Sequence, residues 1–386
     1  MNGDNDRITY LDYNATTPVK PAVTAAMLRA LEEGGNPSSI HAQGRKARAR
    51  LEEAREAVAG LSGACSENVI FTSGGTEANN LGILGLARAQ NVQTIFCSAI
   101  EHPSVREAAF SSGLDCREIA VTHQGQLDLT ALDEALANCA GRPLLALMLA
   151  NNETGVIQPL AQAAERIHAA GGWLHCDAVQ AAGKIPLQLN ELQADSLALS
   201  AHKLGGPQGV GALVLAEAAD ISARLQGGGQ ERGRRGGTEN LPGITGFGEA
   251  AKLALNDLSV FAMLNKTRDA FEARLKKMSP GLVVFGEQSE RLPNTSAFAV
   301  LGMPAETLLM ALDLAGVAVS SGSACSSGKV GESRVLKAMG VDKELARCAL
   351  RVSLGWASTQ EDIDHFLAAF AGVRAYVPQA AFSVAR

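Results

Sequence analysis

The chain has 386 residues, of which 46% are hydrophobic, and its 34 Lys and Arg against 40 Asp and Glu give a formal net charge of −6. This length is enough for about two or three domains with a large buried core. A general nucleic-acid-binding protein is usually basic, so the acidic balance argues against that class. No apolar run approaches the ~20 residues that span a membrane, and the polar N-terminus resembles neither a signal peptide nor an Arg-rich transit segment. We therefore expect a cytoplasmic protein with no nucleic-acid and no membrane partner.

Cysteine spacing excludes the common metal and redox motifs. The seven cysteines occupy positions 65, 97, 116, 139, 176, 325 and 348. No C-x-x-C pair occurs, so a zinc finger or a paired redox motif has no support, and we expect no metal site. An odd number of cysteines in a long chain of this kind indicates free thiols.

Strand-like and helix-like segments alternate through the first two thirds of the chain. Short apolar runs predict strands, and the periodic stretches between several of them predict helices; the strands are at 68–72, 94–98, 144–150, 173–176, 196–199 and 211–215, and the helices at 76–89 and 160–170. This alternation predicts an α/β fold with a mostly parallel sheet covered by helices. Ligands of such folds bind at the carboxyl ends of the strands.

The pattern changes in the last third. A glycine-rich, Arg-containing segment at 227–237 comes first, and the order of elements then predicts a smaller α+β domain with helices at 261–277, 305–315 and 361–371 and strands at 295–300, 317–320 and 349–354. We predict a large domain over 16–250, and a small domain formed by 1–15 together with 251–386.

The turn after the strand at 196–199 contains a candidate cofactor lysine. The sequence there is Ser200-Ala201-His202-Lys203-Leu204-Gly205-Gly206. A lysine in a cleft can form a Schiff base with the aldehyde of pyridoxal phosphate (PLP). A single lysine is more often solvated, so the interpretation depends on finding the rest of a PLP site.

A second glycine-containing turn, Thr72-Ser73-Gly74-Gly75-Thr76-Glu77-Ala78, joins a predicted strand to a predicted helix. Glycines let the backbone approach an anion, and the free N–H groups at a helix start bind phosphate. No Gly-Lys-Ser/Thr follows, so this is not a Walker loop. An ordinary helix start with Thr76 as its cap remains the alternative.

Polar residues that could contact a pyridine ring follow three other strands. Asp177 comes directly after 173–176, and an acidic group there can pair with the ring nitrogen of PLP. A helix-capping role would also account for Asp177, but its position 26 residues before Lys203, with a helix-like stretch between, favours a shared site. His102 can stack on a ring and move protons, and the Asn152 amide can bond a ring substituent, although both residues also occur in ordinary loops and turns.

Cys325 has unusual surroundings. It lies in Ser320-Ser321-Gly322-Ser323-Ala324-Cys325-Ser326-Ser327-Gly328, where no bulky apolar residue flanks it. Such an environment suits an accessible thiol that approaches a substrate, and a tolerated loop cysteine is the alternative.

Taken together, the motifs resemble those of the NifS/IscS-type cysteine desulfurases, which are PLP-dependent enzymes of the class V aminotransferase group. The segments that carry the resemblance cover nearly the whole chain and are, in order, Leu11-Asp12-Tyr13-Asn14-Ala15-Thr16-Thr17-Pro18, Asn36-Pro37-Ser38-Ser39, Gly75-Thr76, Glu101-His102-Pro103, Asn151-Asn152-Glu153, Asp177, Gln180, Ser200-Ala201-His202-Lys203, Gly228-Gly229-Gln230-Glu231-Arg232-Gly233, Ser321-Gly322-Ser323-Ala324-Cys325 and Leu350-Arg351-Val352-Ser353-Leu354. The resemblance implies the fold type I of PLP-dependent transferases.

The resemblance also implies how the cofactor is held. Lys203 would form the Schiff base, Asp177 would pair with the pyridine nitrogen, and His102 would stack on the ring. Gln180 and Asn152 would bond near the phenolic oxygen. The phosphate would be bound by Gly75, Thr76, Ser200 and His202, and by Thr238 of a second subunit, which implies a homodimer.

The implied reaction converts L-cysteine to L-alanine and leaves the sulfur as a persulfide on Cys325. Arg351, with Asn36 and Asn152, would hold the substrate carboxylate, since a guanidinium fork matches that group. Lys203 would move the α-proton, and His102 would act as acid and base near the substrate thiol. The sulfur would pass to an acceptor protein, for which an iron–sulfur scaffold is one candidate.

Two features depart from the family pattern. Gln208 stands where the family often has lysine, and the C-terminal segment from Val377 is shorter than the tail that some members use to dock a scaffold.

Two other functions remain open from the sequence. Another class V PLP enzyme, such as an aminotransferase or a selenocysteine lyase, would use the same Lys203 and Asp177. A non-catalytic binding module would use the glycine-rich segment with Arg232, Arg234 and Arg235, although such arginines are more often solvated.

Overall fold

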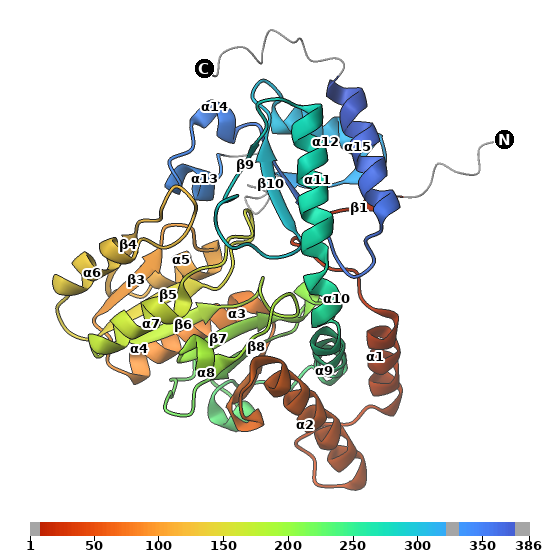
Figure 1. Ribbon diagram of the computed structural model, residues 1–386. Helices are drawn as coiled ribbons and strands as arrows, with labels where there is room; N and C mark the ends of the chain where they lie inside the picture. The colour runs from red at the N-terminus through yellow and green to blue at the C-terminus, as the bar shows by residue number, and fades with distance from the viewer. Residues whose placement is uncertain (1–7, 322–331, 375–386) are drawn as a thin grey trace.

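The computed structural model describes residues 8–321 and 332–374, and Figure 1 shows the arrangement of its elements. A seven-stranded sheet forms the centre, with the order β2-β8-β7-β6-β5-β3-β4. Its strands are β2 (Val69–Thr72), β3 (Thr94–Ser98), β4 (Asp115–Ile119), β5 (Pro143–Met148), β6 (Trp173–Asp177), β7 (Ser196–Ser200) and β8 (Gly211–Leu215). The run β7-β6-β5-β3-β4 is parallel, and β8 is antiparallel to both of its neighbours. The prediction of a mostly parallel sheet is confirmed.

The burial of the strands explains which of them the sequence reveals. Strands β3, β5, β7 and β8 are buried at every position, so they appear as continuous apolar runs. Strand β4 lies at the edge of the sheet and is exposed at most positions, and its sequence Asp-Cys-Arg-Glu-Ile does not predict a strand.

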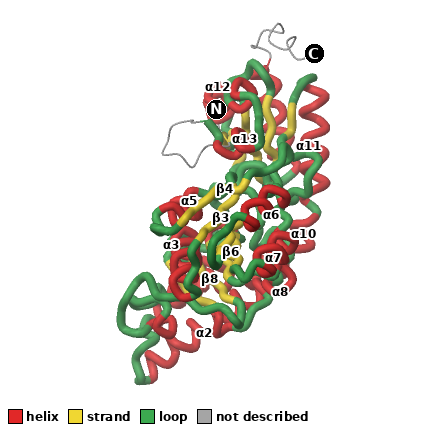
Figure 2. The backbone as a smooth tube through the Cα atoms, turned by 90° about the vertical axis from the view of Figure 1, so that its left-hand side faces the viewer, coloured by secondary structure: helices red, strands yellow, loops and turns green. Residues whose placement is uncertain are grey.

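Helices cover both faces of this sheet, as Figure 2 shows. One face packs against a group that includes α2 (Ala42–Ser62), α6 (Leu129–Ala137), α7 (Leu160–Ala169) and α9 (Leu241–Asn256). The other face packs against α3 (Gly75–Asn80), α4 (Leu86–Ala89) and α5 (Pro103–Phe110). Alternate strand residues supply the two cores, as Ile70 and Phe71 do from β2. Val23 of α1 (Pro21–Glu33) and Leu189 of α8 (Leu189–Leu192) also belong to the first of these cores. The remaining elements of this part are α10 (Leu258–Ala262) and the short 3₁₀ turns η1 (Ser66–Asn68), η3 (Ala201–Lys203) and η4 (Gln230–Gly233).

The helix predicted at 76–89 begins at Gly75 and contains a π-helical turn, η2 (Leu81–Gly85), between α3 and α4. Glycine at position 82 permits a close packing contact there. A Cβ atom on Gly82 would lie 2.4 Å from the imidazole of His175 on β6. The helix can therefore approach the sheet directly over that side chain.

The last third of the chain forms a second, antiparallel sheet of four strands. Its order is β12-β13-β10-β9, with β9 (Val283–Val284), β10 (Thr295–Ala299), β12 (Ser320–Ser321) and β13 (Ala349–Ser353). The helices of this part are α11 (Leu264–Met278), α12 (Ala305–Leu314), α13 (Arg334–Ala338), α14 (Lys343–Ala346) and α15 (Gln360–Arg374). Four phenylalanines form its aromatic core, with ring centroids 5.1–6.5 Å apart, and they are Phe271, Phe298, Phe366 and Phe370.

The strand predicted at 317–320 is divided between two sheets. Strand β11 (Val317–Ala318) pairs in parallel with β1 (Thr9–Tyr10), and β12 pairs with β13. The chain crosses from one sheet to the other at Val319, so the predicted strand contributes to two short strands. The predicted domain boundary after residue 250 falls inside α9, and the division into two domains stays a prediction.

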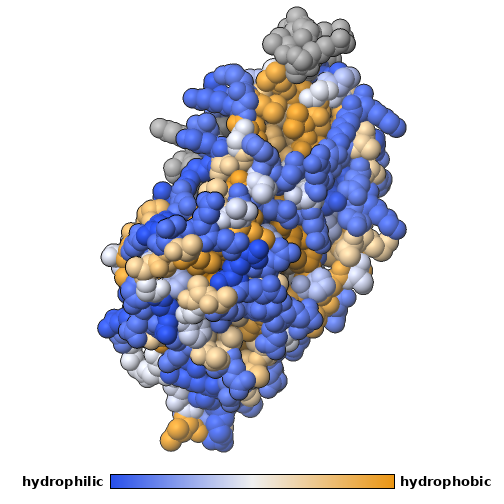
Figure 3. Space-filling model, turned by 60° about the vertical axis from the view of Figure 1, so that its left-hand side comes forward, coloured by the Kyte–Doolittle hydropathy of each residue, from blue (hydrophilic) through white to orange (hydrophobic). Residues whose placement is uncertain are grey.

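None of the described helices is both long and apolar enough to cross a bilayer. The face in Figure 3 is mostly hydrophilic, with apolar side chains visible between the polar ones.

The start of β8 makes the first testable prediction. A Cβ atom on Gly211 would lie 2.6 Å from the carbonyl carbon of Gly74 and 2.6 Å from the carbonyl oxygen of Leu199, and both are backbone atoms. Backbone atoms cannot move aside as a flexible side chain can, so an alanine Cβ atom would clash with them. We therefore expect Gly211→Ala to destabilise the protein by about 1–3 kcal/mol, measured as a lower urea midpoint.

Gly372→Ala is the matched control, because a Cβ atom there meets nothing within 4 Å and the residue lies in α15. It should leave stability unchanged or raise it by up to about 1 kcal/mol. Equal urea midpoints for Gly211→Ala and the wild type would contradict the close approach of β8 to Gly74.

Candidate active site

A cavity of about 300 Å³ lies at the carboxyl ends of the central strands. Strands β5, β6 and β7 are parallel neighbours, so the residues that follow them meet at one edge of the sheet. Ten of the residues predicted for a cofactor and substrate site line this cavity, namely Gly75, Thr76, His102, Asn152, Asp177, Gln180, Ser200, His202, Lys203 and Arg351.

Lys203 ends the 3₁₀ turn η3, which directly follows β7. Its Nζ donates hydrogen bonds to the carbonyl oxygens of Asn14, at 2.6 Å, and Ala15, at 2.7 Å. Both acceptors belong to the N-terminal segment and line the cavity. These bonds keep the amino group of Lys203 beside the space that a ligand would occupy.

Asp177 is the last residue of β6 and is 6% exposed. Its Oδ1 accepts a hydrogen bond from the backbone N–H of Val179, at 3.0 Å, and its Oδ2 accepts one from Nδ2 of Asn79, at 2.8 Å. A carboxylate has about four lone-pair sites, so acceptor capacity remains for a donor in the cavity. This geometry suits pairing with a protonated ring nitrogen.

The corner of the cavity around Gly75 has the features of an anion site. Gly75 begins α3, and Gly74 at the cap position has no side chain to satisfy the first N–H groups. A Cβ atom on Gly75 would lie 2.8 Å from Cγ2 of Val179, so only glycine lets the loop pack this closely. The buried Ser200 lies directly beyond it. Backbone N–H groups and a hydroxyl thus converge where a phosphate would bind.

His202 borders the same corner and is neutral at neutral pH. Burial, with a further contribution from Lys203, lowers the pKa of His202 to about 4. Its Nδ1 lies 3.1 Å from Oγ1 of Thr16. A neutral imidazole with one nitrogen engaged this way can still form a hydrogen bond with its other nitrogen.

His102 is the N-cap residue of α5. Its Nδ1 accepts a hydrogen bond from the backbone N–H of Ser104, at 3.1 Å, and lies 2.7 Å from Oγ of the same residue. Burial lowers the pKa of His102, and Lys203 acts in the same direction while Asp177 opposes it. The ring is therefore held by one of its nitrogens and borders the cavity.

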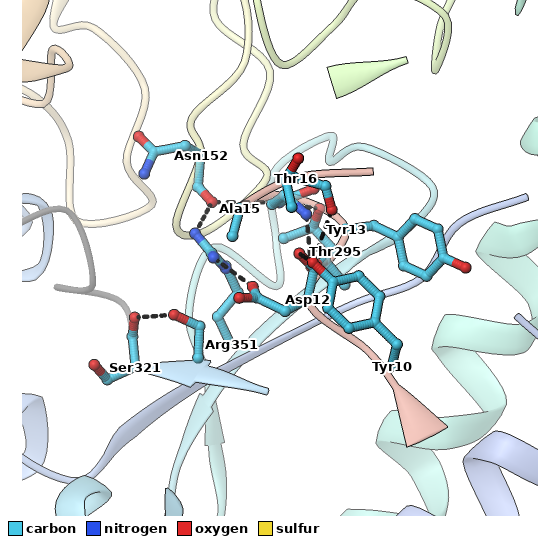
Figure 4. Close-up of polar contacts among 12 residues, drawn as sticks. Tyr10, Asp12, Tyr13, Ala15, Thr16, Asn152, Thr295, Ser321 and Arg351 are labelled. Atoms are coloured by element: carbon cyan, nitrogen blue, oxygen red, sulfur yellow. Dashed lines mark hydrogen bonds and ion pairs between the residues drawn. The ribbon is translucent and has the colours of Figure 1, made fainter. Parts of the chain in front are cut away.

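Arg351, on β13, brings the second sheet to the cavity. It is 2% exposed, and its guanidinium lies between two acceptors, with Nη2 2.7 Å from Oδ1 of Asp12 and Nη1 2.9 Å from the carbonyl oxygen of Asn152 (Figure 4). Its Nε is buried and has no hydrogen-bond partner among the described residues. Arg351 lines the cavity, and the fork of a guanidinium group matches a carboxylate, so this residue suits a ligand that carries one.

Two predicted site residues lie elsewhere in the same chain. Thr238 lines a separate cavity of about 80 Å³, together with Ser73 and Arg235. Asn36 is exposed in the turn between α1 and α2, where its Oδ1 accepts a hydrogen bond from the N–H of Ser38, at 2.8 Å. Cys325 lies outside the described residues.

The structure adds a buried lysine that the sequence did not single out. Lys184 is 3% exposed, and its Nζ donates to Oδ1 of Asn14, at 2.8 Å, and to Oε1 of Gln180, at 2.7 Å. Burial lowers the pKa of Lys184 well below its usual range, and the charges of Lys203 and Arg351 add to this effect. Because the amide oxygen of Gln180 faces Lys184, the amide NH₂ faces the carbonyl of Asn14 and the cavity.

Asn79 and Ser104 were also missed. Asn79 contacts Asp177, and Ser104 contacts His102. The only signal in the sequence is spacing, since Ser104 follows His102 by two residues, a distance at which a cap residue meets the helix backbone.

Glu153 directly follows Asn152 in the chain, and its side chain is the subject of the second prediction. Its Oε2 accepts a hydrogen bond from Oγ of Ser333, at 2.5 Å. Burial raises the pKa of Glu153 from 4.5 to about 7, although Ser333 and Arg351 oppose the rise. The folded protein therefore binds this proton more tightly than the unfolded chain does, and Glu153 destabilises the fold as the pH rises from 4.5 through 7.

We expect Glu153→Gln to remove this pH-dependent penalty. Relative to the wild type, the variant should gain about 2 kcal/mol of stability between about pH 5 and about pH 8, measured by urea unfolding. Glu165→Gln, at an exposed position, is the control, and its stability should differ from that of the wild type by the same amount at both pH values. A stability difference for Glu153→Gln that does not change with pH would refute the raised pKa.

Comparisons with known proteins agree with this site. The model of the aminotransferase class-V family matches residues 9–366. A protein named cysteine desulfurase from Sinorhizobium fredii is 43% identical over 369 residues, which is 94% of this chain and 95% of that protein. One named cysteine desulfurase IscS from Dictyoglomus turgidum is 41% identical over 368 residues, 94% of this chain and 93% of that protein.

A solved structure shares the architecture. The NifS-like protein from Rickettsia africae superimposes with a TM-score of 0.88 at 35% identity, over 96% of this chain and 100% of that one. The expected fold type of PLP-dependent enzymes is thereby confirmed. The chain belongs to the aminotransferase class-V family and, within it, to the cysteine desulfurases.

Proposed function

We propose that this protein is a PLP-dependent cysteine desulfurase that converts L-cysteine to L-alanine and carries the released sulfur as a persulfide on Cys325. The observation that carries the proposal is one cavity in which Lys203, Asp177 and Arg351 meet, together with sequence relatives that bear the desulfurase name. A lysine and an acid at neighbouring strand ends suit PLP, and a buried arginine suits an amino-acid carboxylate.

The residues of the cavity fit PLP group by group. Lys203 would hold PLP through its amino group, and Asp177 would accept a hydrogen bond from the ring nitrogen. The amide groups of Gln180 and Asn152 would bond the phenolic oxygen. The phosphate corner consists of Gly75, Thr76, Ser200 and His202. When bound, PLP withdraws electrons from the α-carbon of an amino acid.

The chain's own residues then orient the substrate and move its protons. Arg351 and Asn152 hold the carboxylate, and this orients the α-hydrogen of cysteine toward Lys203. Lys203 Nζ takes that proton and returns it. His102 forms a hydrogen bond near the substrate thiol from the imidazole edge that faces the cavity.

The sulfur step is a transfer between two thiols. The Cys325 thiolate attacks the sulfur of the substrate, a new S–S bond forms, and the carbon–sulfur bond breaks with its electron pair left on carbon. That carbon takes up a proton, so that cysteine plus the enzyme thiol becomes alanine plus the enzyme persulfide. We propose that the persulfide then passes to an acceptor protein, for which an iron–sulfur scaffold is one candidate.

We further propose that the enzyme works in the cytoplasm as a homodimer. Thr238 and Asn36 lie away from the cavity of their own chain, as expected of residues that act on the cavity of a second copy. In this arrangement Thr238 reaches the phosphate and Asn36 the substrate carboxylate.

The binding-module alternative loses its main support in the structure. Arg235 forms an ion pair with Glu77, at 2.9 Å. Arg232 and Arg234 both donate to the carbonyl oxygen of Glu67, at 3.1 and 3.2 Å. These arginines hold the glycine-rich segment against η1 and α3. An aminotransferase or a selenocysteine lyase remains the closest competitor, because either would share Lys203 and Asp177.

Loss of the Cys325 thiol is the direct test of the reaction. We expect Cys325→Ala to lower the production of alanine from cysteine by more than about 100-fold while visible cofactor absorbance is retained, because the sulfur acceptor is gone. Cys139→Ala, which removes a different thiol, should keep full activity. Full activity in Cys325→Ala would refute the desulfurase mechanism.

The lysine assignment has a separate test. Borohydride reduction of the holoenzyme should attach the cofactor covalently to the peptide that contains Lys203, as detected by mass spectrometry. Lys203→Ala should lose this label and the visible absorbance, whereas the exposed Lys252→Ala should keep both. Label found on another lysine would contradict the assignment.

A further inference from the structure

A chain of hydrogen bonds runs beneath the cavity from Asp177 to His102. Asn79 lies at its centre, 1% exposed, and its Nδ2 donates to Oδ2 of Asp177, at 2.8 Å, and to Oγ of Ser104, at 2.9 Å. Ser104 Oγ in turn lies 2.7 Å from Nδ1 of His102. On the other side, Oδ1 of Asn79 lies 3.0 Å from Nε2 of His175.

The chemistry of each group fixes the direction of these bonds. The Asp177 carboxylate can only accept, so the NH₂ group of Asn79 must face it and the amide oxygen must face His175. His175 therefore donates from Nε2, and its Nδ1 accepts from Oγ of Ser196, at 2.8 Å. His175 is fully buried, and burial lowers its pKa to about 3, so it is the neutral ring that this pattern requires.

The donor and acceptor roles of Ser104 and His102 follow in the same way. Both hydrogens of the Asn79 amide are now assigned, one to Asp177 and one to Ser104, so Oγ of Ser104 accepts from Asn79 and has its own hydrogen free to donate. The nearest acceptor is Nδ1 of His102. The backbone N–H of Ser104 can only donate, and it too points at this Nδ1, at 3.1 Å. A protonated Nδ1 would face two donors, so this nitrogen must carry its lone pair.

We propose that Asn79 and Ser104 are positioning residues that fix His102 as the neutral tautomer with its proton on Nε2, and that Asn79 links this tautomer to the cofactor partner Asp177. In this tautomer Nε2 of His102 is a hydrogen-bond donor without a lone pair, and the residue lines the cavity. This deepens the proposed function and rests on it only for the identity of the ligand, because the tautomer follows from the protein groups alone.

The proposal changes the role expected of His102. In the resting enzyme His102 can donate a hydrogen bond from Nε2 to a sulfur or oxygen atom of a ligand, but it cannot remove a proton there. Removal of the substrate protons then falls to another group, and Lys203 Nζ lines the same cavity. The acid-and-base role predicted for His102 is thus narrowed to that of a donor.

The charged groups around His102 come from three segments. Asp177 extends from β6, Lys203 from η3, and Glu101 precedes His102 in its own loop, with Oε1 accepting from the N–H of Met148, at 2.9 Å. Asp177 favours the imidazolium form of His102 and Lys203 disfavours it. The hydroxyl of Ser104 favours the neutral form directly, because its proton occupies the Nδ1 lone pair.

Nitrogen-15 NMR of the holoenzyme, selectively labelled in the rings of its seven histidines, tests the proposal. The chemical shifts of protonated and unprotonated ring nitrogens differ widely, so the spectrum reports the tautomer whether or not the enzyme turns over cysteine. The His102→Gln variant identifies the signals of His102 by their absence. In the wild type at neutral pH we expect a protonated Nε2 and an unprotonated, hydrogen-bonded Nδ1.

In Ser104→Ala the loss of one donor should move the Nδ1 signal and raise the midpoint of His102 titration by about one unit, a tenfold change in proton affinity. Ser104→Thr retains the hydroxyl and should restore both. The matched control is Ser111→Ala, which removes an exposed hydroxyl at the other end of α5 that bonds the carbonyl of Ala108. It should leave His102 unchanged.

Either of two results would overturn the proposal: a wild-type His102 that carries its proton on Nδ1 or on both nitrogens at neutral pH, or a titration midpoint in Ser104→Ala equal to that of the wild type. The wild-type spectrum decides the tautomer even if the variants fold poorly. Failure of the desulfurase assay with the expected tautomer present would count against the proposed function alone.

Discussion

The arrangement of the site depends on one buried carboxylate, that of Asp177 at the end of β6. An ionised group that is 6% exposed needs donors on its oxygens, and the protein supplies two of them, the backbone of Val179 and the side chain of Asn79. With two donors the carboxylate can still accept another hydrogen bond from the cavity, and a protonated ring nitrogen would supply it. Asn79 can serve Asp177 only if its oxygen finds a donor of its own, and the neutral His175 provides it. The need of the Asp177 carboxylate for hydrogen-bond donors thus determines how the Asn79 amide is oriented and which nitrogen of His175 carries its proton.

Lys203 is positioned in a different way, by backbone carbonyls of the N-terminal segment. The N-terminal segment runs from β11, where the N–H of Leu11 bonds the carbonyl of Ala318, to the turn after β7, where the N–H of Thr17 bonds the carbonyl of His202. Along this path it presents the carbonyls of Asn14 and Ala15 to Lys203. Carbonyl oxygens accept hydrogen bonds from an ammonium group, and these two bonds hold the amino group of Lys203 at the cavity.

Much of this architecture could be predicted from the sequence, for a physical reason. Buried parallel strands have continuous apolar sequences, so the polar residues that follow them, such as Asp177 and Lys203, are easily recognised. The residues that escaped prediction act through the fold. Asn79 lies mid-helix and meets Asp177 only because the helix packs closely over β6, and Lys184 is buried although lysine is usually exposed. Short exposed strands such as β4 also escaped, because they lack the apolar pattern. The roles of the individual site residues stay predictions, since they concern groups bound to the protein.

Arg351 joins the cavity to the small sheet, and this connection has consequences for substrate binding. Its guanidinium is paired with Asp12, and Asp12 itself forms a β-bridge with Ser353 on the same strand as Arg351. The charge of Arg351 is therefore partly neutralised before any ligand arrives, and a ligand carboxylate must add to this pair or displace Asp12 from it. Each terminal nitrogen of the guanidinium carries a second N–H beside the one that bonds Asn152 or Asp12, so a ligand carboxylate can add to the pair. A carboxylate bound in this way leaves the bond to Asp12 intact, so the arginine keeps one orientation with and without a ligand. Such an arginine needs little reorganisation to bind a carboxylate.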